Sequence, residues 1–159
     1  MMKILLLTGE SGVGKTTISK KLCEDNQFHE VLSFSTRQPR NADDRDHFYI
    51  DKEDVWDCFL GGDIVASTIF GGEVYFASSN QFLEDKINVY VVDELGVLDN
   101  VNYWLPKGAD IYIMKIVSDR ECDRKHRDYQ ILTDEYFDLI IENDDLDETV
   151  EKISKKIWE

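Results

Sequence analysis

A glycine-rich run near the start of the chain has the spacing of a loop that binds phosphate. Residues 9–16 read GESGVGKT and fit the pattern G-x-x-x-x-G-K-[ST] between an apolar run and a helical pattern. Gly9, Gly12 and Gly14 can adopt backbone angles closed to other residues, so that successive N–H groups can point at one anion. We therefore expect this loop to bind a nucleoside triphosphate such as ATP, through Gly9, Ser11, Gly12, Val13, Gly14, Lys15, Thr16 and Thr17.

Three side chains could act on the phosphates and on a metal ion. Lys15 would bring a mobile ammonium group to the β- and γ-phosphates, and the Thr16 hydroxyl could bind Mg²⁺. Asp93 ends an aliphatic strand, where ligands of open α/β sheets collect, so it could hold Mg²⁺ or its water. Alternatively, Asp93 caps the helix that starts at Glu94, and Glu94 is a weaker candidate for the metal.

Apolar runs alternate with helical patterns along the chain, which predicts an α/β fold with a parallel sheet covered on both faces. The glycine pair at 71–72 predicts a β-hairpin inserted in this pattern. Strands are expected at 3–8, 31–35, 64–70, 74–76, 88–93, 111–117 and 137–141. Helices are expected at 15–25, between Asp51 and Gly61, after Ser78 or Ser79, at 94–104, at 118–127 and through Ile157.

Length and charge limit the functions that the chain can serve. Its 159 residues suit one compact domain, and 42% of them are apolar. The formal net charge of −15 (18 basic against 33 acidic residues) disfavours binding to nucleic acid or to anionic lipid. No apolar run approaches the roughly 20 residues of a membrane span. The three cysteines are widely spaced, so we expect no disulfide framework. We expect a cytoplasmic protein.

Basic residues gather at two places in this acidic chain. Arg37 and Arg40 flank Pro39 in a polar loop that also contains Arg45, and guanidinium groups bind phosphate in a planar, bidentate way. A solvated loop in which these arginines pair with Asp43, Asp44 or Asp46 is the alternative. The second cluster consists of Arg120, Arg124, Lys125 and Arg127.

Five segments resemble, in order, those of the guanylate kinase family of nucleoside monophosphate kinases. Residues 33–40 (SFSTRQPR) are similar to the family's run ending T-R-x-P-R, and residues 46–49 (DHFY) to its D-Y-x-F. Residues 72–78 (GEVYFAS) resemble G-N-x-Y-G-T-S, and residues 92–96 (VDELG) resemble I-D-x-x-G. Residues 141–147 (IENDDLD) are close to V-x-N-D-D-L-D, so the matches cover nearly the whole chain.

This resemblance implies a P-loop kinase fold in one domain, residues 1–159, with a central five-stranded parallel sheet flanked by helices. It adds a small hairpin-containing insertion for the acceptor (about 33–80) and a lid (about 118–136). The catalytic residues would be Lys15, Arg37 and the lid arginines Arg124 and Arg127. The acceptor-binding residues would be Ser33, Arg37, Arg40, His47, Ile69, Tyr75, Ser78 and Asp93.

The chain also departs from the family. The family's guanine-reading glutamate falls at about Ile69, its acceptor-phosphate tyrosine at His47, and the first aspartate of its D-x-D strand end at Val91. Between Arg127 and Phe137 the chain is shorter than the family's lid. We therefore expect a retained donor site, a shortened lid and an altered acceptor site, in which Ser67, Thr68 or Glu73 could contact another base.

The resemblance thus predicts an ATP- and Mg²⁺-dependent kinase that acts on small-molecule nucleotides, with a nucleoside or deoxynucleoside monophosphate as acceptor. A catalytically silent guanylate-kinase-like module that binds a phosphopeptide, or a kinase of another small acceptor, are the alternatives. The complete phosphate loop with Lys15 favours an enzyme. Acceptor base, sugar preference and oligomeric state stay open.

Overall fold

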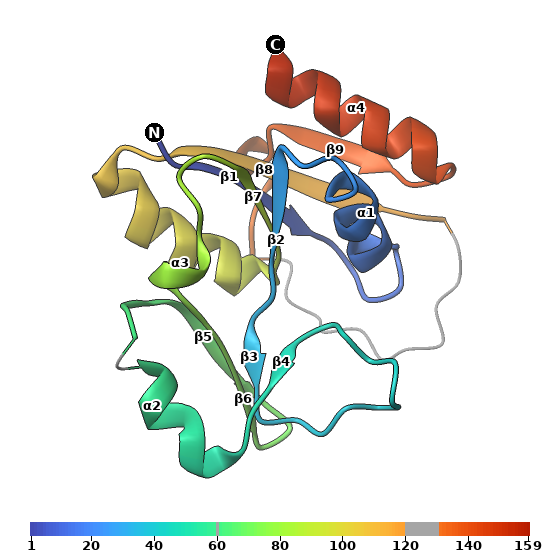
Figure 1. The fold of residues 1–159 in the computed structure, drawn as a ribbon. Helices are drawn as coiled ribbons and strands as arrows, with labels where there is room; N and C mark the ends of the chain where they lie inside the picture. Colours follow the sequence, from blue (N-terminus) through green and yellow to red (C-terminus); the bar gives the residue numbers. More distant parts are fainter. Residues whose placement is uncertain (60, 120–130) are drawn as a thin grey trace.

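Five parallel strands form the central sheet in the order β2-β7-β1-β8-β9. The computed structural model describes residues 1–59, 61–119 and 131–159 (Figure 1). The strands are β1 (Lys3–Thr8), β2 (Phe28–Val31), β7 (Ile87–Val91), β8 (Asp110–Val117) and β9 (Leu139–Glu142). The predicted parallel sheet is therefore confirmed, with the strand before the phosphate loop at its centre.

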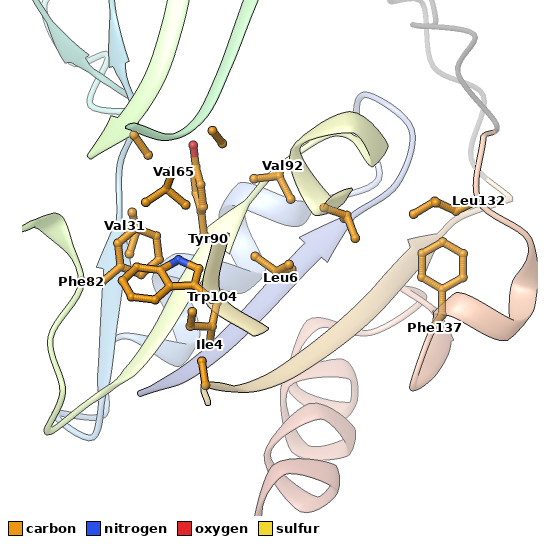
Figure 2. Packing of buried hydrophobic residues seen from close by; sticks show 14 residues of the cluster. Ile4, Leu6, Val31, Val65, Phe82, Tyr90, Val92, Trp104, Leu132 and Phe137 are labelled. Atoms are coloured by element: carbon orange, nitrogen blue, oxygen red, sulfur yellow. The ribbon is translucent and has the colours of Figure 1, made fainter. Parts of the chain in front are cut away.

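Helices cover both faces of this sheet because β1 is apolar on both sides. Leu5 and Leu7 pack in a buried cluster with α1 (Lys15–Leu22) and α4 (Leu146–Trp158). Ile4 and Leu6 point to the opposite face and pack in a second cluster with α3 (Glu94–Trp104) (Figures 1 and 2). All four side chains are fully buried. This two-sided burial is typical of parallel sheets.

A second sheet of four strands, in the order β4-β3-β6-β5, carries the predicted hairpin. β5 (Ile64–Phe70) and β6 (Glu73–Ser78) pair antiparallel, and both glycines of the turn between them have positive φ angles. β3 (Phe34–Ser35) and β4 (Phe48–Tyr49) complete this sheet, and the short helix α2 (Val55–Phe59) follows them. Val65 and Ala66 of β5 join the buried cluster of α3, so the two sheets share a core (Figure 2).

The predicted strand at 31–35 is wrong, because the chain passes there from one sheet to the other. Phe28 and Val31 are buried in β2 of the central sheet, whereas Phe34 and Ser35 pair with β6. Figure 1 shows β2 leading directly into β3. One apolar run thus serves two sheets, which the alternation of residue types does not reveal.

Two helix predictions need correction, and a third concerns residues that lie mostly outside the described part of the chain. The helix after Ser78 is a single 3-10 turn, Ser79–Gln81, since Phe82 has extended backbone angles. Asp51 precedes the 3-10 turn Lys52–Asp54 that leads into α2, but its side chain accepts no capping hydrogen bond. The helix predicted at 118–127 falls largely on residues 120–130, outside the described residues.

In the ranges that the structure describes, no helix has both the length and the apolar character that crossing a membrane requires. The described cysteines, Cys23 and Cys58, are free thiols. Burial raises the pKa of Cys23 to about 12, so this thiol stays protonated at neutral pH.

Gly9 links the end of β1 to β8 through a close backbone contact. Its φ angle is +147°, and a Cβ atom there would lie 2.2 Å from the carbonyl oxygen of Ile116 in β8. Only glycine fits this position, because neither the backbone angle nor the carbonyl of a central strand can change cheaply.

We expect Gly9→Ala to destabilise the chain by about 2–5 kcal/mol, through backbone strain and overlap with β8. For a chain of this length the melting temperature should fall by roughly 5–15 °C. Gly71→Ala is the control, because Gly71 also has a positive φ angle but nothing lies within 4 Å of its added Cβ. Thermal unfolding followed by circular dichroism measures both. Equal losses in the two variants would contradict the close contact.

Candidate active site

The phosphate loop leads from the carboxyl end of β1 into α1, as the sequence predicts. Gly12 and Gly14 have φ angles of +85° and +99°, and α1 begins at Lys15 immediately after Gly14. The Lys15 ammonium donates hydrogen bonds to the carbonyl oxygens of Gly9 at 2.5 Å and Glu10 at 2.7 Å. The loop therefore holds this cation at its mouth, next to the positive end of the α1 dipole.

Asn143, at the turn between β9 and α4, fixes the phosphate loop from behind. Its side-chain amide donates to the carbonyl oxygen of Val13 at 2.8 Å, and its own oxygen accepts from the Thr149 hydroxyl at 3.0 Å. A Cβ atom on Gly14 would lie 2.5 Å from the Asn143 nitrogen, so glycine permits this close approach. The Asn143 turn thus positions the loop.

A cavity of about 740 Å³ joins the phosphate loop to the arginine-bearing loop. Both Arg37 and Arg40 line it, so tertiary structure brings these arginines and Lys15 around one space although they lie more than 20 residues apart. Two lining acids have partners: Asp46 pairs with Lys20 at 3.2 Å, and Glu30 accepts from the Ser19 hydroxyl at 3.2 Å. The lining also includes Ser11, Gly12, Gly14, Thr16, Thr17, Val31, Leu32, Ser33, His47, Tyr90 and Val91.

Arg37 is held in place by its own loop. One guanidinium nitrogen lies 3.3 Å from a carboxylate oxygen of Asp44, and the other donates to the Tyr49 hydroxyl at 2.9 Å. The guanidinium also lies 5.2 Å from the centre of the Tyr49 ring. Arg37 therefore does pair with an acid of its own loop, as the alternative expectation held. The pair still leaves Arg37 on the cavity wall.

Asp44 organises the arginine-bearing loop. Its side chain is only 4% exposed and accepts hydrogen bonds from the Arg40 and Asp46 main-chain N–H groups and from the Tyr49 hydroxyl. These bonds hold the pKa of Asp44 well below its usual range. Sequence analysis gave Asp44 only as one of three partners for arginine and missed Tyr49, because neither follows a recognisable spacing.

His47 and Ser33 form a second pair on the cavity wall. The Ser33 hydroxyl and the His47 ring nitrogen Nδ1 share a hydrogen bond of 2.8 Å. The imidazole makes edge contacts with the rings of Tyr49 and Tyr75. Burial, followed by the charge of Arg37, lowers the pKa of His47, so we expect a neutral ring at neutral pH.

A smaller cavity of about 150 Å³ adjoins the larger one and shares Ser33, His47, Tyr90 and Val91 with it. It lies among β5, β6, β7 and α3. Its other lining residues are Ala66, Ser67, Thr68, Tyr75, Val92, Asp93, Gly96 and Asp99. A ligand bound at Arg37 and Arg40 could therefore extend into this second space.

Asp93 caps α3, which was the alternative to a metal role. Its oxygen Oδ1 accepts from the Gly96 main-chain N–H at 2.7 Å, and the side chain lines the smaller cavity, whereas Thr16 lines the larger one. Glu94 is buried and accepts from the N–H groups of Leu132, at 2.8 Å, and Ile131. The contribution of Asp93 to metal binding stays a prediction.

Several predicted residues lie away from the two cavities or outside the described part of the chain. Ile69 is 76% exposed and lines neither cavity. The three residues of the same strand that line the smaller space are Ala66, Ser67 and Thr68. Ser78 is buried but lines neither cavity. Arg124 and Arg127 fall outside the described residues.

Of the three residues proposed to contact another base, two are well placed. Ser67 and Thr68 line the smaller cavity. Glu73 instead accepts a hydrogen bond from the Thr36 hydroxyl at 2.5 Å and lies 3.8 Å from the ammonium of Lys52. Glu73 therefore ties the hairpin to β3 and lines neither cavity.

Comparison with known proteins gives relatives of one kind. No model of a protein family matches the chain. It is 25% identical over 179 residues to guanylate kinase of Prochlorococcus marinus subsp. pastoris, covering 99% of this chain and 97% of that protein. It is 27% identical over 177 residues to guanylate kinase of Anaplasma phagocytophilum, covering 95% and 83%.

A solved structure shares the fold. The crystal structure of guanylate kinase from Anaplasma phagocytophilum matches 98% of this chain and 84% of its own, with a TM-score of 0.69 and 18% sequence identity. This likeness extends over nearly the whole chain and supports the P-loop kinase fold.

We expect Asp44→Asn to destabilise the chain by about 1–3 kcal/mol at pH 7, because the amide places a donor against groups that now donate to the carboxylate. The depressed pKa of Asp44 contributes stability above the unfolded value of about 4, so the difference from the native chain should shrink as the pH falls below it. Denaturant unfolding at pH 7 and at pH 3 measures this. Asp43→Asn, at an exposed neighbour, is the matched control; equal stability of both variants at pH 7 would contradict the role of Asp44.

Proposed function

The chain belongs to the guanylate kinase family of nucleoside monophosphate kinases, and on that premise we propose that it transfers the γ-phosphoryl group of ATP to a nucleoside or deoxynucleoside monophosphate. One observation carries the proposal. The phosphate loop with Lys15 and the pair Arg37 and Arg40 line a single cavity in a chain of net charge −15. An acidic protein that gathers its cations around one space has a site suited to two phosphate-bearing ligands.

The phosphate loop would bind the donor. Its main-chain N–H groups and the amino end of α1 face the β- and γ-phosphates, and Lys15 moves its ammonium from the Gly9 and Glu10 carbonyls to the transferred group. The loop carbonyls that hold Lys15 in this structure thus keep the charge close to where it is needed. Little reorganisation is required when ATP binds.

Mg²⁺ fits this site through the donor phosphates rather than through a cage of acids. Within the described ranges, no three His, Cys, Asp or Glu side chains gather to hold a metal. Thr16 lines the larger cavity and offers a hydroxyl oxygen, a ligand that Mg²⁺ accepts together with phosphate oxygens and water. When bound, the ion would neutralise charge on the transferring phosphoryl group.

Arg37 and Arg40 would hold the acceptor phosphate opposite the donor. Asp44 and Tyr49 keep Arg37 in one orientation, so less side-chain freedom is lost when the phosphate binds. The acceptor oxygen is already an anion, so the reaction needs no general base. The chain's contribution is to position two anions in line and to offset their charge.

A coupled assay of ADP release tests the proposal across the common ribo- and deoxyribonucleoside monophosphates, with ATP and Mg²⁺. At least one monophosphate should raise turnover well above the background ATP hydrolysis. If none does, and calorimetry also detects no binding of ATP–Mg²⁺, the chain acts as a binding module instead of an enzyme. Binding of ATP without transfer to any monophosphate would indicate another small acceptor.

Lys15→Ala should lower kcat at least about a hundredfold, since it removes a cation that stabilises charge in the transition state. The fold should stay intact, because the two carbonyl oxygens that Lys15 contacts can bind water instead. Lys21→Ala removes the same charge from the surface of α1, where Lys21 pairs only with Glu24 among the described residues, and is the control. Turnover near the native value in Lys15→Ala, with an unchanged circular dichroism spectrum, would overturn the assignment.

A further inference from the structure

The smaller cavity has the chemistry of a site for a flat ring that donates hydrogen bonds. Its walls include the rings of Tyr75 and His47 and the small residues Ala66 and Gly96. Two carboxylates, Asp93 and Asp99, line it, whereas none of its described lining residues is Lys or Arg. Because an ionised carboxylate only accepts hydrogen bonds, a ligand must bring the donors.

The two carboxylates differ in what they already bind. Oxygen Oδ1 of Asp93 caps α3 through the Gly96 N–H. Asp99 lies further along α3 and accepts a hydrogen bond from the main-chain N–H of Ser67 in β5. Burial raises the pKa of Asp99 and so does the nearby charge of Asp93, while the hydrogen bond from Ser67 opposes this rise. A hydrogen bond donated by a ligand would stabilise the charged form of Asp99.

The Tyr90 hydroxyl beside these acids also has no hydrogen-bond partner among the described residues. Tyr90 is 5% exposed and lines both cavities, and no described residue forms a hydrogen bond with its hydroxyl. Figure 2 shows the Tyr90 ring rising from β7 with its oxygen at the end away from the strand. Burial and the charges of Asp93 and Asp99 raise its pKa, so the hydroxyl stays protonated near them. Because Tyr90 lines both cavities, its hydroxyl is available to a ligand atom or a water molecule there.

We propose that Asp99 determines the specificity for the acceptor base, by accepting hydrogen bonds from a base that carries an exocyclic amino group. This inference rests on the proposed function, because the acceptor phosphate at Arg37 and Arg40 places the base in the adjoining smaller cavity. Ser67 and Thr68 flank Asp99 and supply hydroxyl groups for the remaining edge of the ring. The carboxylate that contacts the base would thus come from Asp99 in α3, whereas the resemblance places the family's glutamate at about Ile69 in β5.

The bases differ in what they offer to a carboxylate. Guanine, adenine and cytosine each carry an amino group, whereas uracil and thymine present carbonyl oxygens at the corresponding positions. A site built to accept hydrogen bonds rejects an analogue that lacks the donor, because its buried acceptor is then left unpaired. GMP against IMP isolates this group, since the two differ only by the amino group. CMP against UMP differs at the amino-bearing position and also at N3, which carries a hydrogen only in UMP.

The experiment measures kcat/KM for GMP, IMP, CMP and UMP with native chain and with Asp99→Asn. In the native chain the better pair should favour its amino-bearing member about tenfold or more. Asp99→Asn should reduce that ratio several-fold and leave the KM for ATP unchanged. Asp57→Asn, an exposed residue of α2, removes one charge of the same sign and should leave the ratio as it is.

Calorimetric titration with the same four monophosphates separates the two hypotheses, because it does not need turnover. A native chain that binds GMP over IMP, with a preference lost in Asp99→Asn, would support Asp99 even if no phosphoryl transfer occurred. Transfer to monophosphates with the same ratios in the native chain and in Asp99→Asn would overturn the role of Asp99 and leave the kinase proposal standing. No preference for the amino-bearing member of either pair would also overturn it.

Discussion

The site depends on holding several cations close together before any phosphate is present. Lys15 is held by two loop carbonyl oxygens, and Arg37 by Asp44 and Tyr49. Each cation therefore has oxygen partners, and both cations line the same cavity. A chain of net charge −15 can offset their repulsion with nearby oxygen atoms and still present positive charge to a polyanion.

The sheet topology places these groups opposite one another. The strand order β2-β7-β1-β8-β9 sets β7 between β2 and β1, so the loops that leave β1 and β2 flank the carboxyl end of β7. Tyr90 and Val91, near that end, line both cavities. The crevice outside the carboxyl ends of the strands, where the strand order reverses, is where open α/β sheets bind ligands. Here the second sheet closes one side of that crevice and supplies Ser67, Thr68 and Tyr75.

Of the three positions where the chain departs from the family pattern, His47 and Val91 line both cavities and Ile69 lines neither. The phosphate loop and the arginine loop keep residues that can contact phosphate, which is chemically the same for every nucleotide. The residues around a base must instead match one ring edge, and here they include Ala66, Asp99 and a buried Tyr90. Our proposal of a kinase with its own acceptor preference is consistent with phosphate-contacting residues beside a base cavity of this composition.

The sequence by itself determined those elements whose conformation depends on residues close together in the chain. Spacing of glycine and lysine gave the phosphate loop, two-sided apolar runs gave the buried strands, and the glycine pair gave the hairpin. Tertiary structure alone decided that one apolar run serves two sheets and that Ala66 and not Ile69 lines the smaller cavity. It also decided that Asp44 pairs with Arg37 and that Tyr90 and Asp99 line the smaller cavity. These roles arise from contacts between segments far apart in the chain, and hydrophobic periodicity carries no record of which distant group a side chain will meet.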